Sequence, residues 1–188
     1  MDEWSLANVA IRAERADDID AITAVVADAF QSPVEAALPA AIRASENFVP
    51  EWSLVADLRG RIVGHVMVSY VGLHDEDAGA DDTAAPRRVA SLSPMSVARE
   101  FHSRGIGSAL IRAVLARADD AGEPLVVLEG DPRYYSRFGF EHSLPLGIRI
   151  TLPEWAPAEA AQLCRLRRYD PAIRGRIVYP PAFETLEH

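Results

Sequence analysis

Cysteine, long apolar runs and basic residues near the start are scarce in this sequence, and each scarcity excludes a class of protein. Cys164 is the only cysteine among 188 residues, so no intrachain disulfide is possible. A single thiol of this kind is usually a small buried hydrophobic group. No run approaches the ~20 apolar residues of a membrane-spanning helix. The start, Met1-Asp2-Glu3-Trp4, lacks the basic residues of a secretion signal, so we expect a cytoplasmic protein that binds no membrane.

Positive charge is also too scarce for a nucleic-acid-binding protein. The chain has 19 Lys and Arg residues against 28 Asp and Glu residues, a formal net charge of -9 at pH 7. This excess of negative charge repels a phosphate backbone and favours cationic partners. Part of it lies in residues 74–82, whose lack of apolar periodicity predicts a solvated loop. Electrostatic attraction of an amine substrate is the alternative interpretation of these residues.

Apolar content is sufficient for one core. Hydrophobic residues make up 49% of the chain, and no internal repeat or low-complexity linker marks a boundary, which predicts a single domain over residues 1–185. Residues 186–188, Leu-Glu-His, resemble a vector-encoded junction leading into a histidine tag, and they are left out of the functional interpretation.

In the first half of the chain, periodicity predicts strands and amphipathic helices. Residues 8–12 are β-prone, and a helix over residues 19–30 follows Asp17 and Asp18, which are candidate helix caps. A second helix follows Pro33 and extends to residue 42. Residues 52–58 and 62–71 flank Arg59-Gly60 and predict a β-hairpin. Both helices are expected to cover the sheet.

In the second half, a strand at 88–97, a helix at 106–118 and a buried strand at 125–128 predict a βαβ unit. The two strands of such a unit are parallel, with a right-handed crossover. Asp131 and Pro132 predict the start of a short helix. Residues 140–142, 147–151, 160–168 and 173–179 predict later strands. The expected fold class is therefore α/β, in an α+β arrangement.

The loop between residues 97 and 106 predicts a site for a diphosphate. The first ~4 backbone N–H groups of a helix have no partner within it and point toward any anion at its start. Gly105 and Gly107 lack the Cβ atoms that would block a close approach. Arg104 adds positive charge beside the positive end of the helix dipole.

Pro94 predicts a gap in the sheet next to this loop. Proline cannot donate to a strand ladder and is tolerated only at an edge or a bulge. If the strands at 88–97 and 125–128 separate beyond Pro94, the backbone groups of residues 95–97 can pair with an amide-bearing ligand. A pantetheine arm carries such amides and ends in a diphosphate, which favours a coenzyme A thioester as the ligand.

Two motifs in this order resemble the GNAT family of N-acetyltransferases, and the likeness covers most of the chain. The family's acetyl-CoA motif is similar to residues 95–97, Met-Ser-Val, and residues 102–110, His-Ser-Arg-Gly-Ile-Gly-Ser-Ala-Leu. One position departs from the motif: His102 stands where the family usually has Gln or Arg. Residues 129–140 resemble the second signature, a Tyr followed by Gly-Phe, and residues 175–183 the tail of a poorly characterised bacterial branch of predicted acetyltransferases. The resemblance implies a mixed, mostly antiparallel sheet with helices on both faces. Its parallel strand pair, 88–97 and 125–128, would be splayed at the cofactor site.

The resemblance also implies a reaction, in which a primary amine attacks acetyl-CoA directly. Tyr135 matches the family's general acid, which protonates the departing thiolate, and the N–H of Met95 is the candidate oxyanion donor. The implied cofactor-binding residues are Met95, Ser96, Val97, His102, Ser103, Arg104, Gly105, Ile106, Gly107, Ser108 and Tyr135. No metal site is expected, because His65 and His142 have no second ligand at metal spacing.

Other interpretations stay open. Glu129 either relays a proton from the incoming ammonium or favours the start of the following helix. A non-catalytic acetyl-CoA-binding module that regulates a partner protein is one alternative function. An NAD(P)-binding enzyme is disfavoured by Leu110, because the glycine-rich motif of such enzymes needs Gly or Ala at this position for close packing of the helix on the strand. A P-loop is disfavoured because no Lys follows Gly107. The sequence leaves open which amine is accepted and whether the protein is a monomer or a homodimer.

Overall fold

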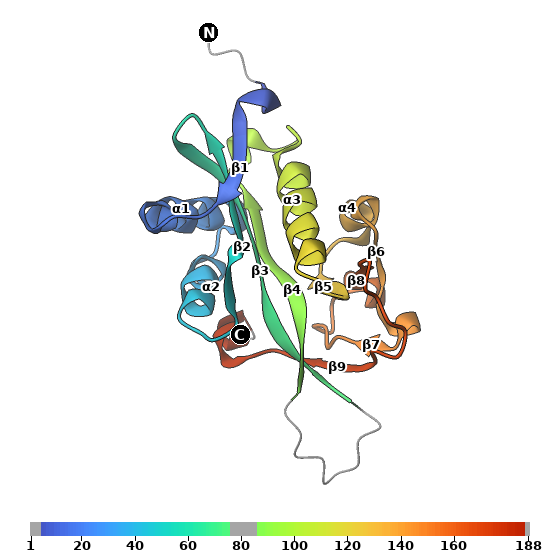
Figure 1. Cartoon of the computed structure of the whole chain (residues 1–188). Helices are drawn as coiled ribbons and strands as arrows, with labels where there is room; N and C mark the ends of the chain where they lie inside the picture. Colours follow the sequence, from blue (N-terminus) through green and yellow to red (C-terminus); the bar gives the residue numbers. More distant parts are fainter. Residues whose placement is uncertain (1–4, 76–85, 187–188) are drawn as a thin grey trace. The chain divides into compact units, whose positions relative to one another are not determined.

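The computed structural model describes residues 5–75 and 86–186 of the chain (Figure 1). Its α-helices are α1 (Ile19–Phe30), α2 (Pro33–Arg43), α3 (Ile106–Asp120) and α4 (Pro132–Tyr135). Its strands are β1 (Val9–Ala13), β2 (Phe48–Leu58), β3 (Arg61–His74), β4 (Arg87–Val97), β5 (Leu125–Glu129), β6 (Phe140–His142), β7 (Ile148–Arg149), β8 (Ala161–Arg165) and β9 (Gly175–Val178). Among the described residues, no helix combines the length and the apolar character needed to cross a membrane.

The described residues form two compact units. The first contains residues 5–69, 92–117 and 182–186, and the second contains residues 70–75, 86–91 and 118–181. β3, β4 and α3 each contribute residues to both units. That the chain is a single domain over residues 1–185 stays a prediction.

In the first unit, helices cover both faces of the sheet. β2 pairs antiparallel with β1 and with β3, α1 and α2 lie on one face, and α3 lies on the other (Figure 1). On the first face, a buried apolar cluster joins α1 to the strands; it consists of Ile22, Val25, Val26, Val55 and Ile62. On the other face, a Cβ added to Gly64 would lie 3.0 Å from Leu110 Cδ1, so the glycine on β3 makes room for the large side chain on α3.

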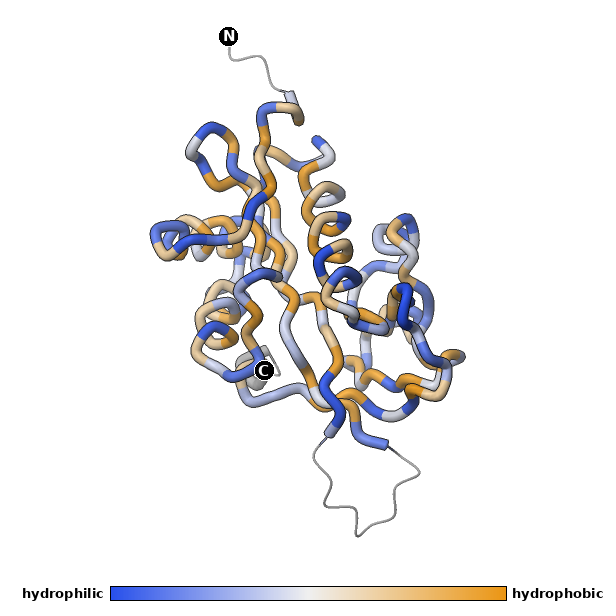
Figure 2. Tube along the Cα trace, viewed as in Figure 1, coloured by the Kyte–Doolittle hydropathy of each residue, from blue (hydrophilic) through white to orange (hydrophobic). Residues whose placement is uncertain are grey.

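The second unit is a mixed sheet. β5 pairs parallel with β4 and antiparallel with β8, β8 pairs antiparallel with β6, and the end of β3 pairs antiparallel with β9. The predicted fold class is confirmed: the pairing is mostly antiparallel, with β4 and β5 as the expected parallel pair. A second parallel pair, β7 with β9, was not predicted. Figure 2 shows hydrophobic residues recurring along the strands of both units.

Several predicted boundaries were wrong. β2 begins at Phe48 instead of residue 52, because its pairing with β3 resumes across a register shift before Ser53. β3 extends to His74, and β8 ends at Arg165. Asp18 does not cap α1 through its side chain; its carboxylate instead accepts hydrogen bonds from Arg12 Nη1 and Nη2, at 2.7 and 2.9 Å. Most of the acidic stretch at 74–82 lies outside the described residues.

Candidate active site

The loop between β4 and α3 turns through left-handed backbone at two positions. The φ angles are 59° at Ser103 and 83° at Gly105. Leu6 Cδ2 lies 3.3 Å from the position that a Cβ of residue 105 would take, so a side chain there would be both strained and crowded. Glycine at position 105 thus has two physical reasons, backbone conformation and packing, that the sequence analysis did not give; the close approach of a ligand stays a prediction.

The start of α3 carries unpaired backbone donors. The first hydrogen bond inside the helix runs from the N–H of Ala109 to the carbonyl of Gly105, over 3.0 Å. Among the described residues, no acceptor contacts the N–H groups of Ile106, Gly107 or Ser108. These three amides and the helix dipole make the loop a place where an anion is favoured.

Two guanidinium groups lie beside this loop, on one aromatic ring. Arg104 Cζ is 5.4 Å and Arg61 Cζ is 5.2 Å from the centre of the Phe101 ring. Phe101 is buried, whereas Arg104 is exposed. Arg104 directly precedes Gly105 and the start of α3, whereas the positive charge of Arg61 is already paired with Glu100.

His102, the residue that departs from the family pattern, bridges the loop to β4. Its Nε2 lies 2.8 Å from the carbonyl oxygen of Val97. The sequence analysis expected this carbonyl to be free for a ligand amide, and the imidazole takes one of its two acceptor positions. The second acceptor position of the oxygen can still serve a ligand.

β4 loses its parallel neighbour already before Pro94, whereas the sequence analysis expected the strands to separate beyond it. Among the described residues, the pairing of β4 with β5 consists of Ala90 with Val126 and Ser91 with Val127. The Ser93–Pro94 peptide bond is cis. Further along, the side chain of Ser96 is buried, while Met95 and Val97 are half-buried.

Tyr135 belongs to the second unit, at the end of α4. Asp131 caps this helix, since its carboxylate accepts a hydrogen bond from the N–H of Arg133 over 2.9 Å. The phenol ring packs edge-on against Phe140, with 5.7 Å between the ring centres. Burial, with a smaller contribution from Tyr134, raises the pKa of Tyr135 to about 12. The phenol is therefore protonated over the whole range in which an enzyme of this kind would work.

Gly130 provides the space that Tyr135 occupies. A Cβ at residue 130 would lie 2.5 Å from Tyr135 Cε2, closer than any real contact allows. The backbone of Gly130 is held on both sides: its N–H donates to the carbonyl of Ala160 over 3.0 Å, and its carbonyl accepts from Gln162 Nε2 over 2.9 Å. A residue larger than glycine must therefore move the phenol ring.

Replacing Gly130 with Ala should consequently impair catalysis by displacing the phenol. We expect a roughly 10-fold to 100-fold lower kcat, because a misplaced group loses most of its catalytic effect, with little change in thermal stability. The measurement is thiol release from acetyl-CoA, with a thermal melt as a control for folding. An unchanged kcat would show that the position of the ring does not matter.

Glu129 contacts a residue that sequence reasoning missed. Tyr179 donates a hydrogen bond from its hydroxyl to Glu129 Oε1 over 2.6 Å. Burial, together with the carboxylate, raises the pKa of Tyr179. Tyr179 lies within residues 175–183, the segment that resembles the tail of predicted acetyltransferases. It is 50 residues from Glu129, so no local sequence pattern connected the two. Both interpretations of Glu129 stay open.

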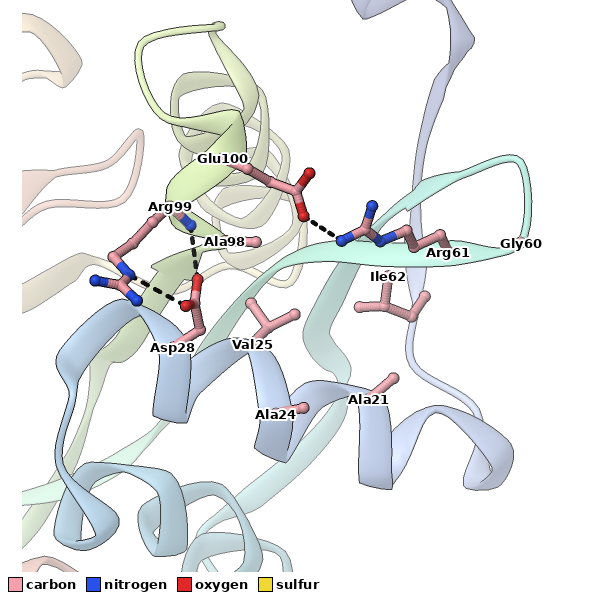
Figure 3. Close-up of a pocket in the computed structure, with 10 residues that line it drawn as sticks. All are labelled: Ala21, Ala24, Val25, Asp28, Gly60, Arg61, Ile62, Ala98, Arg99 and Glu100. Carbon is pink, nitrogen blue, oxygen red and sulfur yellow. Dashed lines mark hydrogen bonds and ion pairs between the residues drawn. The ribbon is translucent and has the colours of Figure 1, made fainter. Parts of the chain in front are cut away.

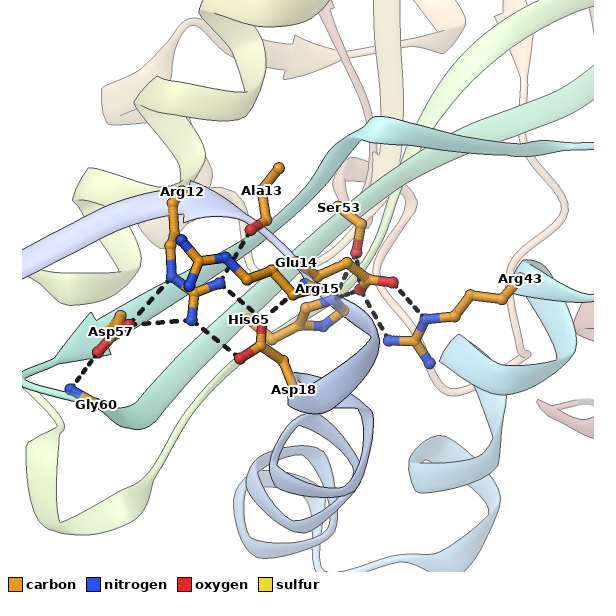
Figure 4. Close-up of polar contacts among 10 residues, drawn as sticks. All are labelled: Arg12, Ala13, Glu14, Arg15, Asp18, Arg43, Ser53, Asp57, Gly60 and His65. Carbon is orange, nitrogen blue, oxygen red and sulfur yellow. Dashed lines mark hydrogen bonds and ion pairs between the residues drawn. The ribbon is translucent and has the colours of Figure 1, made fainter.

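A buried polar network, composed of Glu14, Arg43, Ser53 and His65, connects the end of β1 to α2, β2 and β3 (Figure 4). Arg43 Nε and Nη2 donate to Glu14 at 2.6 and 2.9 Å, and the hydroxyl of Ser53 donates to the same carboxylate. His65 Nε2 lies 3.0 Å from Ser53 Oγ and 3.6 Å from Glu14 Oε2. The sequence analysis noted only His65, as a residue without metal partners.

The network keeps Glu14 charged and His65 neutral. Burial raises the pKa of Glu14, but hydrogen bonds from Arg43, His65 and Ser53 outweigh it and lower the pKa to about 2. Burial lowers the pKa of His65 below its ordinary 6.5 by more than Glu14 raises it. At neutral pH the network thus contains one carboxylate, one guanidinium and one uncharged imidazole.

A cavity of about 720 Å³ opens in the first unit between α1, the turn from β2 to β3, and residues 98–100 (Figure 3). Its charged groups are paired across it: Asp28 accepts from the N–H and Nε of Arg99 at 2.8 and 3.1 Å, and Arg61 contacts Glu100. Ala98 and Val25 contribute its apolar wall. The carboxylates of Asp28 and Glu100 are therefore partnered by the guanidinium groups of Arg99 and Arg61. Within residues 5–75 and 86–186, no group of three His, Cys, Asp or Glu side chains is placed to hold a metal ion.

Comparisons with known proteins agree with this arrangement. Residues 10–143 match the family model described as an acetyltransferase (GNAT) domain. The chain is 30% identical over 166 residues to the uncharacterized N-acetyltransferase YhbS of Escherichia coli K12, covering 88% of this chain and 90% of that protein. A solved structure of YhbS in complex with CoA has a TM-score of 0.81 and 26% identity, over 97% of this chain and 95% of that one. A GNAT family acetyltransferase from Brucella melitensis, in complex with acetyl-CoA, has a TM-score of 0.72 and 29% identity, over 94% and 98%.

Proposed function

Because the chain belongs to the GNAT acetyltransferase family and is an acyltransferase, we propose that it moves the acetyl group of acetyl-CoA to a primary amine. The observation that carries the proposal is the set of unpaired N–H groups of Ile106, Gly107 and Ser108, next to Arg104. Binding of CoA and acetyl-CoA by the similar proteins of E. coli and B. melitensis supports it.

The proposed binding mode divides the cofactor between the loop and β4. The diphosphate contacts the amides of residues 103–108, where Gly105 permits a close approach. The pantetheine arm pairs with the backbone of Met95, Ser96 and Val97, beyond the point where β4 loses its pairing with β5. His102 holds the carbonyl of Val97 in place for this pairing.

The proposed chemistry is direct attack. The neutral amine attacks the thioester carbonyl, and the N–H of Met95 stabilises the negative charge that develops on the carbonyl oxygen. The carbon–sulfur bond then breaks, and Tyr135 gives its phenolic proton to the departing thiolate. The acylated nitrogen loses its surplus proton, which restores the phenol of Tyr135 through solvent. The protein supplies alignment, an oxyanion donor and an acid, and no covalent acetyl-enzyme is formed.

The proposed acceptor is cationic before it reacts. The formal net charge of -9 attracts ammonium groups and repels anionic substrates. We place the reaction in the cytoplasm, where acetyl-CoA is available. Small amines, aminoglycoside-like compounds and protein amino groups all satisfy this description.

A free-thiol assay tests the proposal. Purified protein is incubated with acetyl-CoA and a library of primary amines, thiol release is followed, and the products are identified by mass spectrometry. We expect thiol release that depends on the amine, with an added acetyl group on its nitrogen. Binding of acetyl-CoA without thiol release for any amine would instead indicate a cofactor-sensing module.

A further inference from the structure

A buried glutamine on β8 contacts the backbone where β5 leads into α4. Gln162 Nε2 donates a hydrogen bond to the carbonyl oxygen of Gly130 over 2.9 Å, although the two residues are 32 positions apart in the chain. Gln162 is 1% exposed, whereas Gly130 is half-buried. Gly130 directly follows the last residue of β5 and touches the ring of Tyr135. The amide of Gln162 therefore acts on the backbone that supports the proposed acid.

The strand register places Gln162 on the face of the sheet that Tyr135 covers. In the antiparallel pair of β6 and β8, Phe140 lies opposite Cys164 and His142 lies opposite Gln162. Residues two apart on a strand share a face, so Gln162 and Phe140 are on the same face. The ring of Tyr135 packs against Phe140, with 5.7 Å between the ring centres. Gln162 thus lies between β8 and α4.

The carbonyl of Gly130 fixes the direction of the Gln162 amide. A carbonyl oxygen accepts hydrogen bonds and cannot donate them, so it must meet the NH2 group of the glutamine and not its oxygen. Turning the amide over would place two acceptors against each other. Gln162 Oε1 consequently has to point elsewhere, and it is buried without a hydrogen-bond partner among the described residues.

This amide is a poor source of stability. A buried acceptor without a partner costs a free energy as large as, or larger than, the net contribution of one hydrogen bond. An apolar side chain of the same length would avoid that cost, and water could reach the half-buried Gly130 in its place. What the amide of Gln162 adds is a second attachment of Gly130, beyond the hydrogen bond from its N–H to the carbonyl of Ala160 over 3.0 Å.

The second attachment matters because Tyr135 fits Gly130 without spare room. A Cβ at residue 130 would lie 2.5 Å from Cε2 and 2.8 Å from Cδ2 of the phenol ring, so the ring rests on the Cα atom of the glycine. The backbone N–H of Tyr135 donates to the carbonyl of Asp131, the next residue after Gly130, over 3.1 Å. A rotation of the Gly130 peptide would therefore move the start of α4 and the phenol together.

We propose that Gln162 is a positioning residue for the general acid, an inference that rests on the proposed function. Its amide sets the orientation of the Gly130 carbonyl and, through it, the place of the Tyr135 hydroxyl relative to the departing thiolate. Gln162 takes no part in the proton transfer itself. Because catalysis falls steeply when a reacting group is misplaced, loss of this hydrogen bond should lower kcat and leave the binding of acetyl-CoA unchanged.

Gln162→Met tests the proposal, because it removes the amide and keeps the length of the side chain. The probes are acetyl-CoA and the amine of the library that the unaltered enzyme acetylates fastest. We expect kcat to fall by about 5-fold to 20-fold, the KM for acetyl-CoA to stay within about twofold, and the melting temperature to stay nearly unchanged. In the Tyr135→Phe background the same substitution should cost nothing further in kcat, because no hydroxyl is left to position.

Gln162→Glu adds a readout that a purely structural role would not move. A protonated carboxyl group has the shape of the amide and can donate its O–H to Gly130, whereas a carboxylate has no donor. Burial raises the pKa of such a carboxyl group above its ordinary value of about 4.3. The ratio of the variant's kcat to that of the unaltered enzyme should be near one at low pH and fall as the pH rises through that pKa. The other titratable groups around this position, Tyr135 on α4, His142 on β6 and Cys164 on β8, are present in both proteins, so their titration cancels in the ratio.

Ser143→Ala is the matched control, because its hydroxyl is also buried and unpaired in the second unit but makes no hydrogen bond to Gly130. It should leave kcat unchanged. Three results overturn the positioning role and leave the proposed function intact: an unchanged kcat in Gln162→Met, a loss in Gln162→Met that multiplies with that of Tyr135→Phe, or a ratio for Gln162→Glu that is already as low at low pH as that of Gln162→Met. If the unaltered enzyme releases thiol with no amine of the library, the proposed function itself fails.

Discussion

Glu14→Gln is expected to lower the free energy of unfolding by about 3 to 5 kcal/mol, the cost of leaving a buried charge without its partner. Glutamine keeps the size of the side chain but removes the charge that faces Arg43. The two side chains are only 9% and 12% exposed, so water cannot replace the lost interaction. The measurement is chemical denaturation at neutral pH, in the absence of ligand.

The same substitution should change how stability depends on pH. The pKa of Glu14 is about 2 in the folded protein and 4.5 when unperturbed, so the carboxylate contributes stability that is complete above pH 4.5. That contribution, about 3 kcal/mol for a difference of about 2.5 pKa units, is lost as the pH falls from 4.5 toward 2. His65, with its lowered pKa, adds a loss that begins below its unfolded value of 6.5. In Glu14→Gln this part of the loss between pH 4.5 and 2 should be absent, and only the part due to other carboxylates with a lowered pKa, such as Asp18, should remain.

Glu100→Gln is the control for this prediction. Glu100 contacts Arg61 in the same unit, but the two side chains are 58% and 59% exposed. An exposed pair of this kind contributes less than about 1 kcal/mol. Two results would contradict the account of a buried charged network. One is a similar loss of unfolding free energy in Glu14→Gln and Glu100→Gln. The other is an unfolding free energy of Glu14→Gln that depends on pH in the same way as that of the wild type.

The contrast between this network and the phosphate loop shows what the sequence can reveal. The loop was predicted because its determinants lie close together in the chain: Pro94, Arg104, Gly105 and Gly107 are all within a short segment, and each acts through local backbone geometry. The helices and the parallel strand pair were predicted for the same reason, from periodicity over neighbouring residues. Local signals of this kind are strong because they do not depend on the rest of the fold.

The network, and the contact between Gly130 and Tyr135, could not be found in this way. Glu14, Arg43 and His65 come from separate elements, and only the packing of α2 on the sheet places them in contact. Gly130 and Tyr135 are near in sequence, but their contact depends on how α4 turns back over the end of β5. Asp18 is a case in which a local signal predicted the wrong contact. Its residue type and position fit a cap of α1, but its carboxylate accepts a hydrogen bond from the guanidinium of Arg12 on β1.

Tyr135→Phe should lower kcat by about 100-fold or more and leave the affinity for acetyl-CoA nearly unchanged, provided that the phenol is the general acid. The ring keeps its place over Gly130 and against Phe140, so the lost hydroxyl is the only difference at the site. Because the pKa of Tyr135 is about 12, the phenol holds its proton throughout the assay range. The deficit should therefore be the same at every pH at which the enzyme is active.

Tyr134→Phe, one residue away on the same helix, is the control, and its kcat should stay within about twofold of the wild type because it lacks a proton-transfer role. A double-mutant cycle then connects Tyr135 to Gly130. If Gly130→Ala acts only by displacing the phenol hydroxyl, it should cost nothing further in kcat in the Tyr135→Phe background, whereas independent effects would multiply. Turnover of Tyr135→Phe equal to the wild type across pH removes the proposed acid. If the losses in kcat multiply in the double variant, Tyr135 still acts as the general acid, but Gly130 affects kcat in some other way than by placing the phenol.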